Sequence, residues 1–226
     1  MIEFRDLCVY IKDEDTLVFS DIHMGYEEAL NKQGILIPRE QYQMTAERLK
    51  RIVNKHARII INGDIKHEFG SISETEWRHT LRVIDFLATR TKELILVRGN
   101  HDTILGPIAE KRNIKVVDNY RLDNILITHG DKIVQTDADT IIIGHEHPAV
   151  TLMDYPRAEK FKCFLLGNWQ GKKLVVLPSF NLIQEGTDVL REKLLSPYLD
   201  KIDDFTVYVL GHDVLEFGKV KDLKLL

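Results

Sequence analysis

The chain has 226 residues, which suffice for one large α/β domain with a substantial core but are few for two independent domains. Hydrophobic residues make up 44% and charged residues 29%, as in ordinary soluble globular proteins. Because 31 basic residues stand against 35 acidic ones, the formal net charge of −4 excludes non-specific attraction of phosphate polymers by the chain as a whole, so phosphate binding needs local basic patches or metal ions.

Strand-like and helical segments alternate through the first half of the chain. Pro38 is predicted to open a helix that runs to about His56, because proline suits the first turn. A second helix is predicted over Ser73–Thr89, where Ser73 and Glu76 have the spacing of a capping box and apolar residues recur at helical spacing. The predicted strands are Leu7–Ile11, Leu17–Ser20, Arg58–Asn62, Leu94–Arg98, Lys115–Val117, Ile125–Thr128, Thr140–Ile143, Lys162–Leu166, Lys173–Leu177 and Phe205–Leu210.

The order strand–helix–strand–helix–strand in the first half is typical of βαβ units, and the second half is richer in strands. We therefore predict a single domain over residues 1–226 with one sheet per half. The fold class is α/β, a four-layer α/β/β/α sandwich of two mixed sheets flanked by helices.

The two cysteines, Cys8 and Cys163, are too few for a disulfide framework and lack the spacing of a zinc site. Both lie in apolar, strand-like runs, so we expect them to be buried. The first residues show no signal-peptide pattern, and no apolar run approaches the ~18 residues that cross a bilayer. We therefore expect a cytoplasmic protein without membrane association.

Five apolar strands are each followed by residue types that bind metal ions. These motifs are Asp21-Ile22-His23, Gly63-Asp64-Ile65-Lys66-His67, Gly99-Asn100-His101-Asp102, His129-Gly130-Asp131 and Gly144-His145-Glu146-His147. In open α/β sheets the carboxyl ends of the strands form the edge where ligands bind. One such motif could be a turn, since Asp, Asn and Gly favour turns, but five in one chain favour a shared site. The three histidines outside the motifs, His56, His79 and His212, are predicted to be surface residues.

The motifs resemble those of the calcineurin-like metallophosphoesterases, whose pattern is D-x-H, GD-x-x-[DH], GNH[DE], H and GH-x-H. All five occur in this order between Asp21 and His147, over more than half of the chain. Within that family the sequence is most similar to the small archaeal and bacterial phosphoesterases related to the SbcD nuclease. The resemblance implies a phosphoesterase with two divalent metal ions.

The resemblance also assigns seven metal ligands: Asp64 bridges the two ions, Asp21, His23 and His147 bind one of them, and Asn100, His129 and His145 complete the other. A carboxylate shared between the ions offsets their mutual repulsion. Alternate side chains of a strand point the same way, so Asp21 and His23 can share an ion, whereas His145 and His147 serve different ions only if the chain after Gly144 leaves strand geometry. Mixed imidazole, carboxylate and amide ligands favour Mn, with Fe, Zn or Ni as alternatives.

Such a pair of ions lowers the pKa of a bridging water, and the resulting hydroxide attacks phosphorus in line with the leaving oxygen. The resemblance implies that His101 protonates the leaving group or stabilises charge on it. Asp102 is predicted either to orient His101 by a hydrogen bond or to cap a helix over Thr103–Lys111. For His67, the resemblance to the nuclease branch implies support of the site or positioning of the substrate.

Four further residues are candidates for substrate binding, and each has an alternative role. Arg98 opens the third motif as in protein phosphatases, where this arginine binds phosphate. The second motif here continues with His67-Glu68-Phe69 rather than Asp-Arg-Gly, so the paired-arginine clamp for a phosphomonoester is incomplete and Arg98 could form a surface ion pair instead. Phe69 could stack on a base or belong to the core. Ser179 and Asn181 follow another predicted strand and could contact substrate at the rim of the site or form a turn.

We therefore predict a phosphodiesterase or nuclease that hydrolyses P–O bonds in nucleic acid, DNA or RNA, or in nucleotides. The alternative enzymes are a phosphomonoesterase and a cyclic-nucleotide phosphodiesterase. A non-catalytic scaffold that binds partner proteins is disfavoured because all seven ligand positions and His101 are intact. The residues after His147 are needed to finish the second sheet, which disfavours a separate DNA-capping domain. A homodimer is compatible with the sequence, although no exposed apolar stripe requires one.

Overall fold

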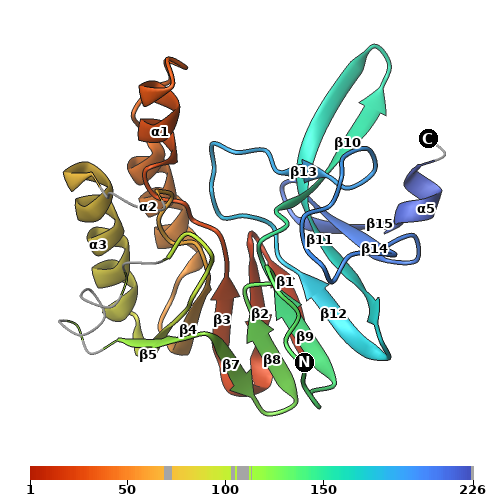
Figure 1. Cartoon of the computed structure of the whole chain (residues 1–226), viewed down its shortest axis with the longest axis horizontal. Coiled ribbons are helices and arrows are strands. Elements are labelled where there is room, and N and C mark those ends of the chain that lie inside the picture. Colours follow the sequence, from red (N-terminus) through yellow and green to blue (C-terminus); the bar gives the residue numbers. More distant parts are fainter. Residues whose placement is uncertain (69–72, 103–104, 106–111, 113, 225–226) are drawn as a thin grey trace.

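Two sheets pack face to face at the centre of the molecule, and each half of the chain builds one of them (Figure 1). The structure is a computed structural model that describes residues 1–68, 73–102, 105, 112 and 114–224. The predicted α/β class with one mixed sheet per half is confirmed.

The first sheet has the strand order β1-β2-β3-β4-β5-β6. Its strands are β1 (Ile2–Arg5), β2 (Cys8–Ile11), β3 (Thr16–Phe19), β4 (His56–Asn62), β5 (Thr91–Val97) and β6 (Lys115–Val117), with a short 3-10 helix η1 (Lys12–Glu14) before β3. Strands β1 to β3 are antiparallel and β3 to β6 are parallel. Parallel neighbours need crossover connections, which are supplied between β3 and β5 by helices on the outer face of this sheet (Figure 1): α1 (Tyr26–Lys32), α2 (Gln41–Ile52) and α3 (Glu74–Ala88).

The second sheet has the order β13-β10-β11-β12-β9-β8-β7, and β14 pairs with β11 and β15. Its strands are β7 (Asn119–Leu122), β8 (Ile125–Thr128), β9 (Thr140–Ile143), β10 (Pro148–Asp154), β11 (Arg157–Trp169), β12 (Lys172–Val176), β13 (Thr187–Asp188), β14 (Thr206–Leu210) and β15 (Val214–Lys219). Strands β8, β9 and β12 run parallel, as do β10 and β13. The hairpin β10–β11 and helix α1 project on the same side of the molecule (Figure 1).

Strand β4 illustrates how the sequence pattern produces the layers. Ile60 packs between the two sheets, whereas Ile59 and Ile61 pack beneath the helices. Because successive strand residues point to opposite faces, a strand covered on both faces requires an unbroken apolar run. Each of the three isoleucines is at most 1% exposed, and burying such a side chain contributes roughly 1.5–3 kcal/mol.

The outer face of the second sheet is covered mainly by irregular chain. Side chains from the segment 189–205, among them Tyr198 and Phe205, pack on this face together with helix α5 (Val220–Leu223). The four-layer α/β/β/α order is therefore present, but the fourth layer contains little helix in the described part of the second half.

Tertiary contacts decide several boundaries that local patterns do not. The helix predicted from Pro38 to about His56 is α2, at Gln41–Ile52, and His56 begins β4 instead. The prediction that His56 is a surface residue is wrong, because its side chain is 8% exposed and its Nδ1 lies 2.9 Å from Oδ1 of Asp15. Six elements have no counterpart among the predictions: α1, β1, β7, β10, β13 and β15.

Other residues of the same kind lie as predicted. Cys8 and Cys163 are buried and unpaired. His212 is exposed, and His79 is half-buried against the ring of Tyr42. Among the helices that the structure describes, none has the length and apolar character required to span a membrane.

Candidate metal centre

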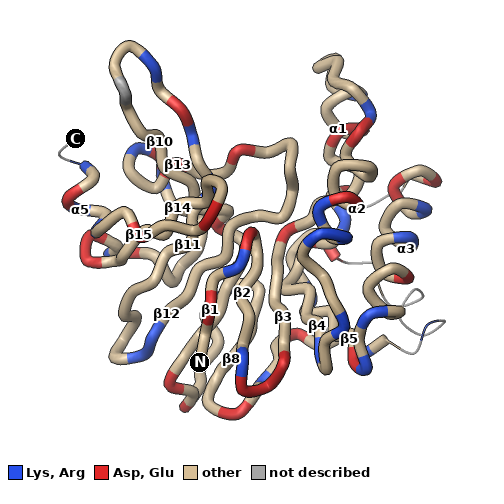
Figure 2. The backbone as a smooth tube through the Cα atoms, turned by 180° about the vertical axis from the view of Figure 1, so that it is seen from behind, with Lys and Arg blue, Asp and Glu red and all other residues tan. Residues whose placement is uncertain are grey.

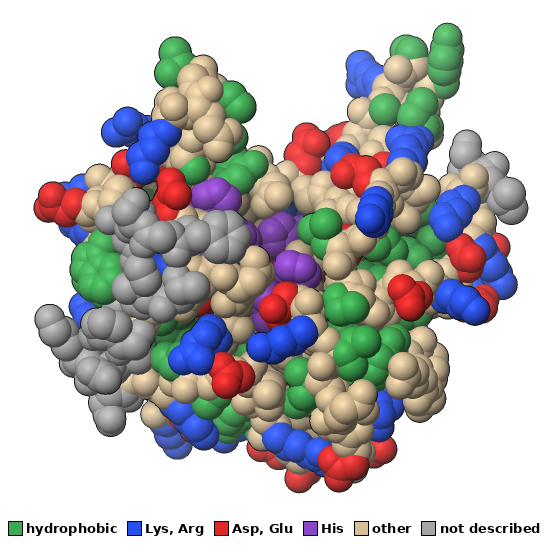
Figure 3. Space-filling model, viewed as in Figure 1, with side chains coloured by type: hydrophobic (Ala, Val, Ile, Leu, Met, Phe, Trp, Pro, Cys, Tyr) green, Lys and Arg blue, Asp and Glu red, His purple; other side chains and the backbone are tan. Residues whose placement is uncertain are grey.

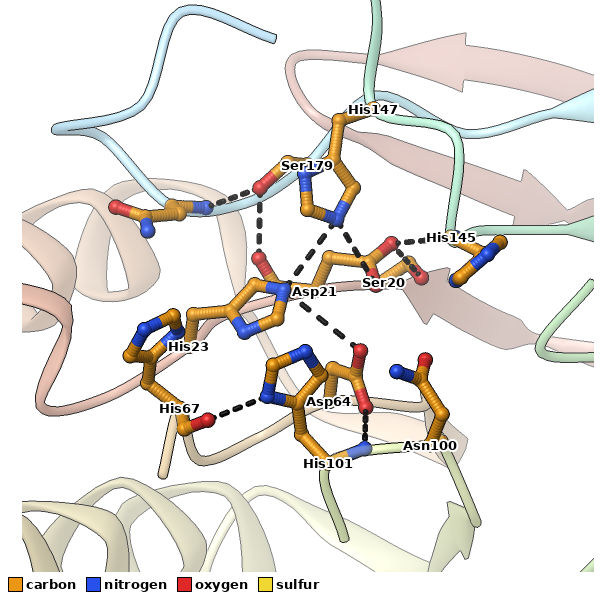
Figure 4. Close-up of polar contacts among 12 residues, drawn as sticks. Ser20, Asp21, His23, Asp64, His67, Asn100, His101, His145, His147 and Ser179 are labelled. Carbon is orange, nitrogen blue, oxygen red and sulfur yellow. Dashed lines mark hydrogen bonds and ion pairs between the residues drawn. The ribbon is translucent and has the colours of Figure 1, made fainter. Parts of the chain in front are cut away.

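The five motifs come together where the carboxyl ends of strands from both sheets meet, and Figure 4 shows residues from four of them. At the end of β4, Asn62 Nδ2 donates to the carbonyl oxygen of Thr128 at the end of β8, at 2.8 Å, and so joins the two sheets beside the site. The N–H of His145, which follows β9, donates to Oδ2 of Asp21, which follows β3, at 3.0 Å. These two bonds bring motifs from both halves into one cluster, at the edge where ligand sites form.

The chain leaves strand geometry before it presents most of the ligands. Five of the seven have φ between 45° and 64°: Asp21, His23, Asp64, His145 and His147. Such left-handed conformations are uncommon for residues other than glycine and gather at functional sites. The expected departure from strand geometry after Gly144 is confirmed. Strand β3 ends at Phe19, so Asp21 and His23 converge through turns and not through alternation along a strand, which corrects the geometric argument made from the sequence.

Asp21, His23 and His147 form a first group of ligand atoms. Nε2 of His147 lies 3.3 Å from Nε2 of His23 and 3.2 Å from Oδ1 of Asp21. One ligand atom from each residue lies within 4.8 Å of the other two. On the other side of its ring, His147 Nδ1 lies 3.2 Å from Oε1 of Gln184, a contact of the kind that fixes the orientation of a ligating imidazole.

Asp64, His129 and His145 form a second group, whose ligand atoms also lie within 4.8 Å of one another. Nε2 of His129 lies 3.3 Å from Oδ2 of Asp64 and 3.2 Å from Nδ1 of His145. Asn100 joins this group, because its Oδ1 lies 2.9 Å from the same Nε2 atom. All seven predicted ligands are thus brought together.

Asp64 lies between the two groups. Its Oδ2 is 3.3 Å from Nε2 of His129 and 3.8 Å from Nε2 of His23, so one oxygen faces both groups. Its Oδ1 accepts the N–H of His101 at 2.8 Å. This is the placement that a carboxylate shared by two cations requires.

The electrostatics of the cluster fit divalent cations. Burial raises the pKa of Asp21, but the charge and hydrogen bond of His147, together with His129 and Ser20, lower it to about 2. Burial lowers the pKa of His129, but its bond to Asp64 and the charge of Asp21 raise it to about 9. Oδ1 of Asp21 is fully buried and has no hydrogen-bond donor among the described residues. An ionised, buried oxygen without a donor is costly unless a cation binds, and the mixed nitrogen and oxygen donors suit first-row transition ions.

His67 and His101 lie beside the first group. Their rings stack with centroids 5.4 Å apart and planes 23° apart, and the His101 ring lies 4.9 Å from that of His23. Nδ1 of His101 bonds to the carbonyl oxygen of His67. The other ring nitrogen, Nε2, therefore faces the ligand cluster (Figure 4).

The Asp102 carboxylate supports the third motif. Its Oδ2 accepts the N–H of Gly99 at 3.1 Å, and its Oδ1 has no hydrogen-bond partner in the described part of the chain. The orienting contact of the His101 ring is thus the carbonyl oxygen of His67, and not the carboxylate of Asp102 as predicted from the sequence. The alternative role of Asp102, as cap of a helix over Thr103–Lys111, concerns a segment that lies largely outside the described residues.

The structure places three of the four candidates for substrate binding. Arg98 is exposed and its Nη1 bonds to Oδ1 of Asp118 at 2.6 Å, the surface ion pair that was its alternative. Ser179 and Asn181 are fully buried, and both donate to the carbonyl oxygen of Asp21, through Oγ at 2.8 Å and the N–H at 3.0 Å respectively. They support the Asp21 turn from beneath rather than lie at the rim. Phe69 lies outside the described residues.

Sequence reasoning missed the residues that hold the ligand loops in place. Glu146, between the two histidines of the fifth motif, is fully buried, and its Oε2 accepts the N–H groups of Leu195 and Ser196 at 2.7 and 2.9 Å. Oγ of Ser196 donates to the carbonyl oxygen of Gly130 at 2.7 Å, so one segment holds both the fourth and the fifth motif. A glutamate enclosed by two histidines was the available signal, whereas nothing in the sequence marks Ser196.

Solved structures with a similar fold come from several organisms. The nuclease MPE of Pseudomonas putida aligns with a TM-score of 0.68 at 21% identity, over 94% of this chain and 92% of that chain. Two others have lower scores. A predicted phosphoesterase of Streptococcus pneumoniae has a TM-score of 0.36 at 15% identity, over 89% and 91% of the two chains. Zinc-complexed Vps29 of Entamoeba histolytica has a TM-score of 0.40 at 19% identity, over 90% and 99%.

Comparison with curated proteins finds no match. A family model described as calcineurin-like phosphoesterase matches residues 15–216, which is most of the chain and includes all five motifs. The ligand groups described above lie entirely within the matched region. The chain belongs to the calcineurin-like phosphoesterase family.

Proposed function

We propose that the protein hydrolyses phosphodiesters, in nucleic acid or in nucleotides, with two divalent metal ions of which Mn is preferred. The observation that carries this proposal is the pair of adjacent ligand groups with Asp64 between them, its Oδ2 lying 3.3 and 3.8 Å from a histidine nitrogen of each group. Membership of the family supports phosphoester hydrolysis, and the preference for a diester is our own inference.

Two cations held there would supply Lewis-acid activation of a water molecule and neutralise charge on the phosphoryl oxygens. Asp21 and Asp64 contribute the negative charge that binds them. Because Nδ1 of His101 is bonded to the carbonyl oxygen of His67, Nε2 is the atom that would pass a proton to the leaving oxygen. The stacked ring of His67 restricts rotation of the His101 ring, which favours this single orientation.

Two observations favour a diester over a monoester. A terminal phosphate dianion is usually held by guanidinium groups, and the guanidinium of Arg98 is already paired with Asp118 at the surface. The likeness to a protein named as a nuclease, MPE of Pseudomonas putida, supports the same choice.

The surroundings of the site are compatible with DNA or RNA as the natural diester. Histidines lie on the floor of a hollow between two projections, and both projections carry Lys or Arg (Figure 3). Lys32 at the end of α1 and Arg157 at the start of β11 are exposed examples. Basic and acidic residues are interspersed over the molecule (Figure 2), so affinity for a polyanion would depend chiefly on the metal ions.

The proposal is tested by the hydrolysis of bis(4-nitrophenyl) phosphate and 4-nitrophenyl phosphate by the manganese-loaded protein, with Asp64→Asn as the control for contaminating activity. We expect the diester to be cleaved faster. A preference for the monoester would replace the proposal with a phosphomonoesterase. If neither ester is cleaved, cyclic nucleotides and oligonucleotides are assayed next, and inactivity on all of them with two ions bound would favour the scaffold.

Cytoplasmic location and a homodimer remain predictions for this chain. Light scattering coupled to gel filtration measures the mass in solution. A monomer mass of 26.2 kDa at all concentrations would exclude the dimer.

A further inference from the structure

Two charged side chains, Lys66 and Glu76, are buried directly behind the loop that carries His67. Each is only 1% exposed. Neither is among the predicted ligands, and neither has a part in the reaction described above. Burying a charged group is costly unless hydrogen bonds compensate it, so the partners of these two side chains indicate what they do.

Lys66 joins two of the metal-site loops. Its ammonium group donates to the carbonyl oxygens of Glu68 and His101, which belong to the second and third motifs. The carbonyl of His101 is part of the same residue whose ring nitrogen Nδ1 bonds to His67. Lys66 therefore holds His101 from the backbone side while His67 holds its ring.

Glu76 reaches the same loop from helix α3. The sequence predicts a capping box, and Oγ of Ser73 does accept the N–H of Glu76, at 3.1 Å. The Glu76 carboxylate, however, accepts the N–H groups of His67 and Glu68, both at 3.0 Å. The side chain expected to finish the helix terminus is used instead to fix the loop beside the metal centre.

The fit around Glu76 leaves little freedom. A Cβ atom added at Gly25 would lie 2.7 Å from Cδ and Cγ of Glu76, so glycine at this position is required for the close approach. Gly25 also has φ 92°, a conformation suited to glycine, and directly precedes helix α1. The N-terminal ends of α1 and α3 thus enclose the Glu76 carboxylate.

We propose that Lys66 and Glu76 are positioning residues for the His67–His101 pair, which they hold in the orientation that delivers a proton to the leaving oxygen, without taking part in metal binding. This inference rests on the proposed function. It differs from a general role in folding, because it requires that the loss be confined to substrates whose leaving group needs a proton.

The test uses the manganese-loaded protein and two diesters, methyl 2,4-dinitrophenyl phosphate and methyl phenyl phosphate. The first has a good leaving group that departs as an anion, and the second has a poor one that needs protonation. We expect Lys66→Met and Glu76→Leu to lower kcat about 100-fold for methyl phenyl phosphate, the scale of general acid catalysis, and by less than about threefold for the dinitrophenyl ester.

The matched control is Glu76→Gln, whose amide oxygen can still accept both N–H groups and which should stay within about threefold of the wild type on both esters. Calorimetric titration should show two Mn ions bound with unchanged affinity in all variants. In a His101→Ala background, Lys66→Met should have no further effect, because both substitutions act through the same imidazole. If Lys66→Met does not fold, Glu76→Leu tests the same loop from the helix side.

Equal losses on the two esters, loss of bound Mn, or additive effects of Lys66→Met and His101→Ala would overturn the inference. Failure of the proposed function looks different, since the wild type would then cleave neither ester.

Discussion

Replacing Glu146 with leucine tests whether the segment behind the metal centre holds the ligand loops in place. The substitution removes the acceptor of two backbone N–H groups, those of Leu195 and Ser196, from a fully buried position. An unsatisfied buried donor costs about 1–3 kcal/mol, so the two together cost about 2–6 kcal/mol. Removing a buried carboxylate whose Oε1 has no described partner offsets part of this, and we expect a net loss of about 3 kcal/mol in the free energy of unfolding.

The measurement is urea unfolding followed by circular dichroism in the presence of EDTA, so that metal binding does not contribute. Glu146→Gln is the control, because its amide oxygen can accept the same two N–H groups, and it should lose less than about 1 kcal/mol. Calorimetry should also show Mn affinity lowered about 10- to 100-fold in Glu146→Leu, as is usual when support for metal ligands is removed. A leucine variant within about 0.5 kcal/mol of the wild type, the range of neutral surface substitutions, would refute the reasoning.

Three further predictions concern the ligands, the metal and a remote carboxylate. Asp64→Asn should lower diester hydrolysis at least ~100-fold and weaken binding of both Mn ions, and unchanged turnover would remove the argument for a shared carboxylate. Mn at about 100 times its Kd should raise the free energy of unfolding by about 2.7 kcal/mol per site over the EDTA-treated protein, and identical urea curves with and without Mn would contradict the site. Partial burial raises the pKa of Asp15, but hydrogen bonds from His56, the N–H of Ala57 and Tyr10 outweigh it and hold the pKa below its ordinary value. Folding lowers this pKa, so the stabilisation is present above the ordinary value of ~3.9 and is lost as pH falls below it; Asp15→Asn should destabilise at about pH 6, by less than about 1 kcal/mol because Asp15 is nearly half exposed, and the difference should vanish near pH 2.

The fold was predictable wherever one strand or helix carries its own pattern. The unbroken apolar run of β4 indicates a strand covered on both faces, and the Ser73 cap marks the start of α3. Short or exposed elements carry no such pattern. Helix α1 has a left-handed glycine at its start and no side-chain cap, and β13 is a two-residue strand held by its pairing with β10.

The ligands of the site were predictable because each follows an apolar strand, and chemistry restricts these positions to carboxylate, amide and imidazole groups. Their supports were not, because they act through backbone atoms. The Glu76 carboxylate binds N–H groups that any residue would offer, and Ser196 binds a glycine carbonyl. Such contacts depend on the path of the backbone, which local sequence does not encode.

The left-handed backbone of five ligands sets selection for stability against selection for catalysis. A non-glycine residue in this conformation costs about 1 kcal/mol, so the five together oppose folding by about 5 kcal/mol, an amount comparable to the whole stability of a modest domain. Glycine at His145 or His147 would relax the turn and remove a ligand in the same step. A lineage released from the need to cleave phosphoesters would therefore gain stability as it lost its metals, and a screen for thermal tolerance alone would tend to discard the catalytic residues first.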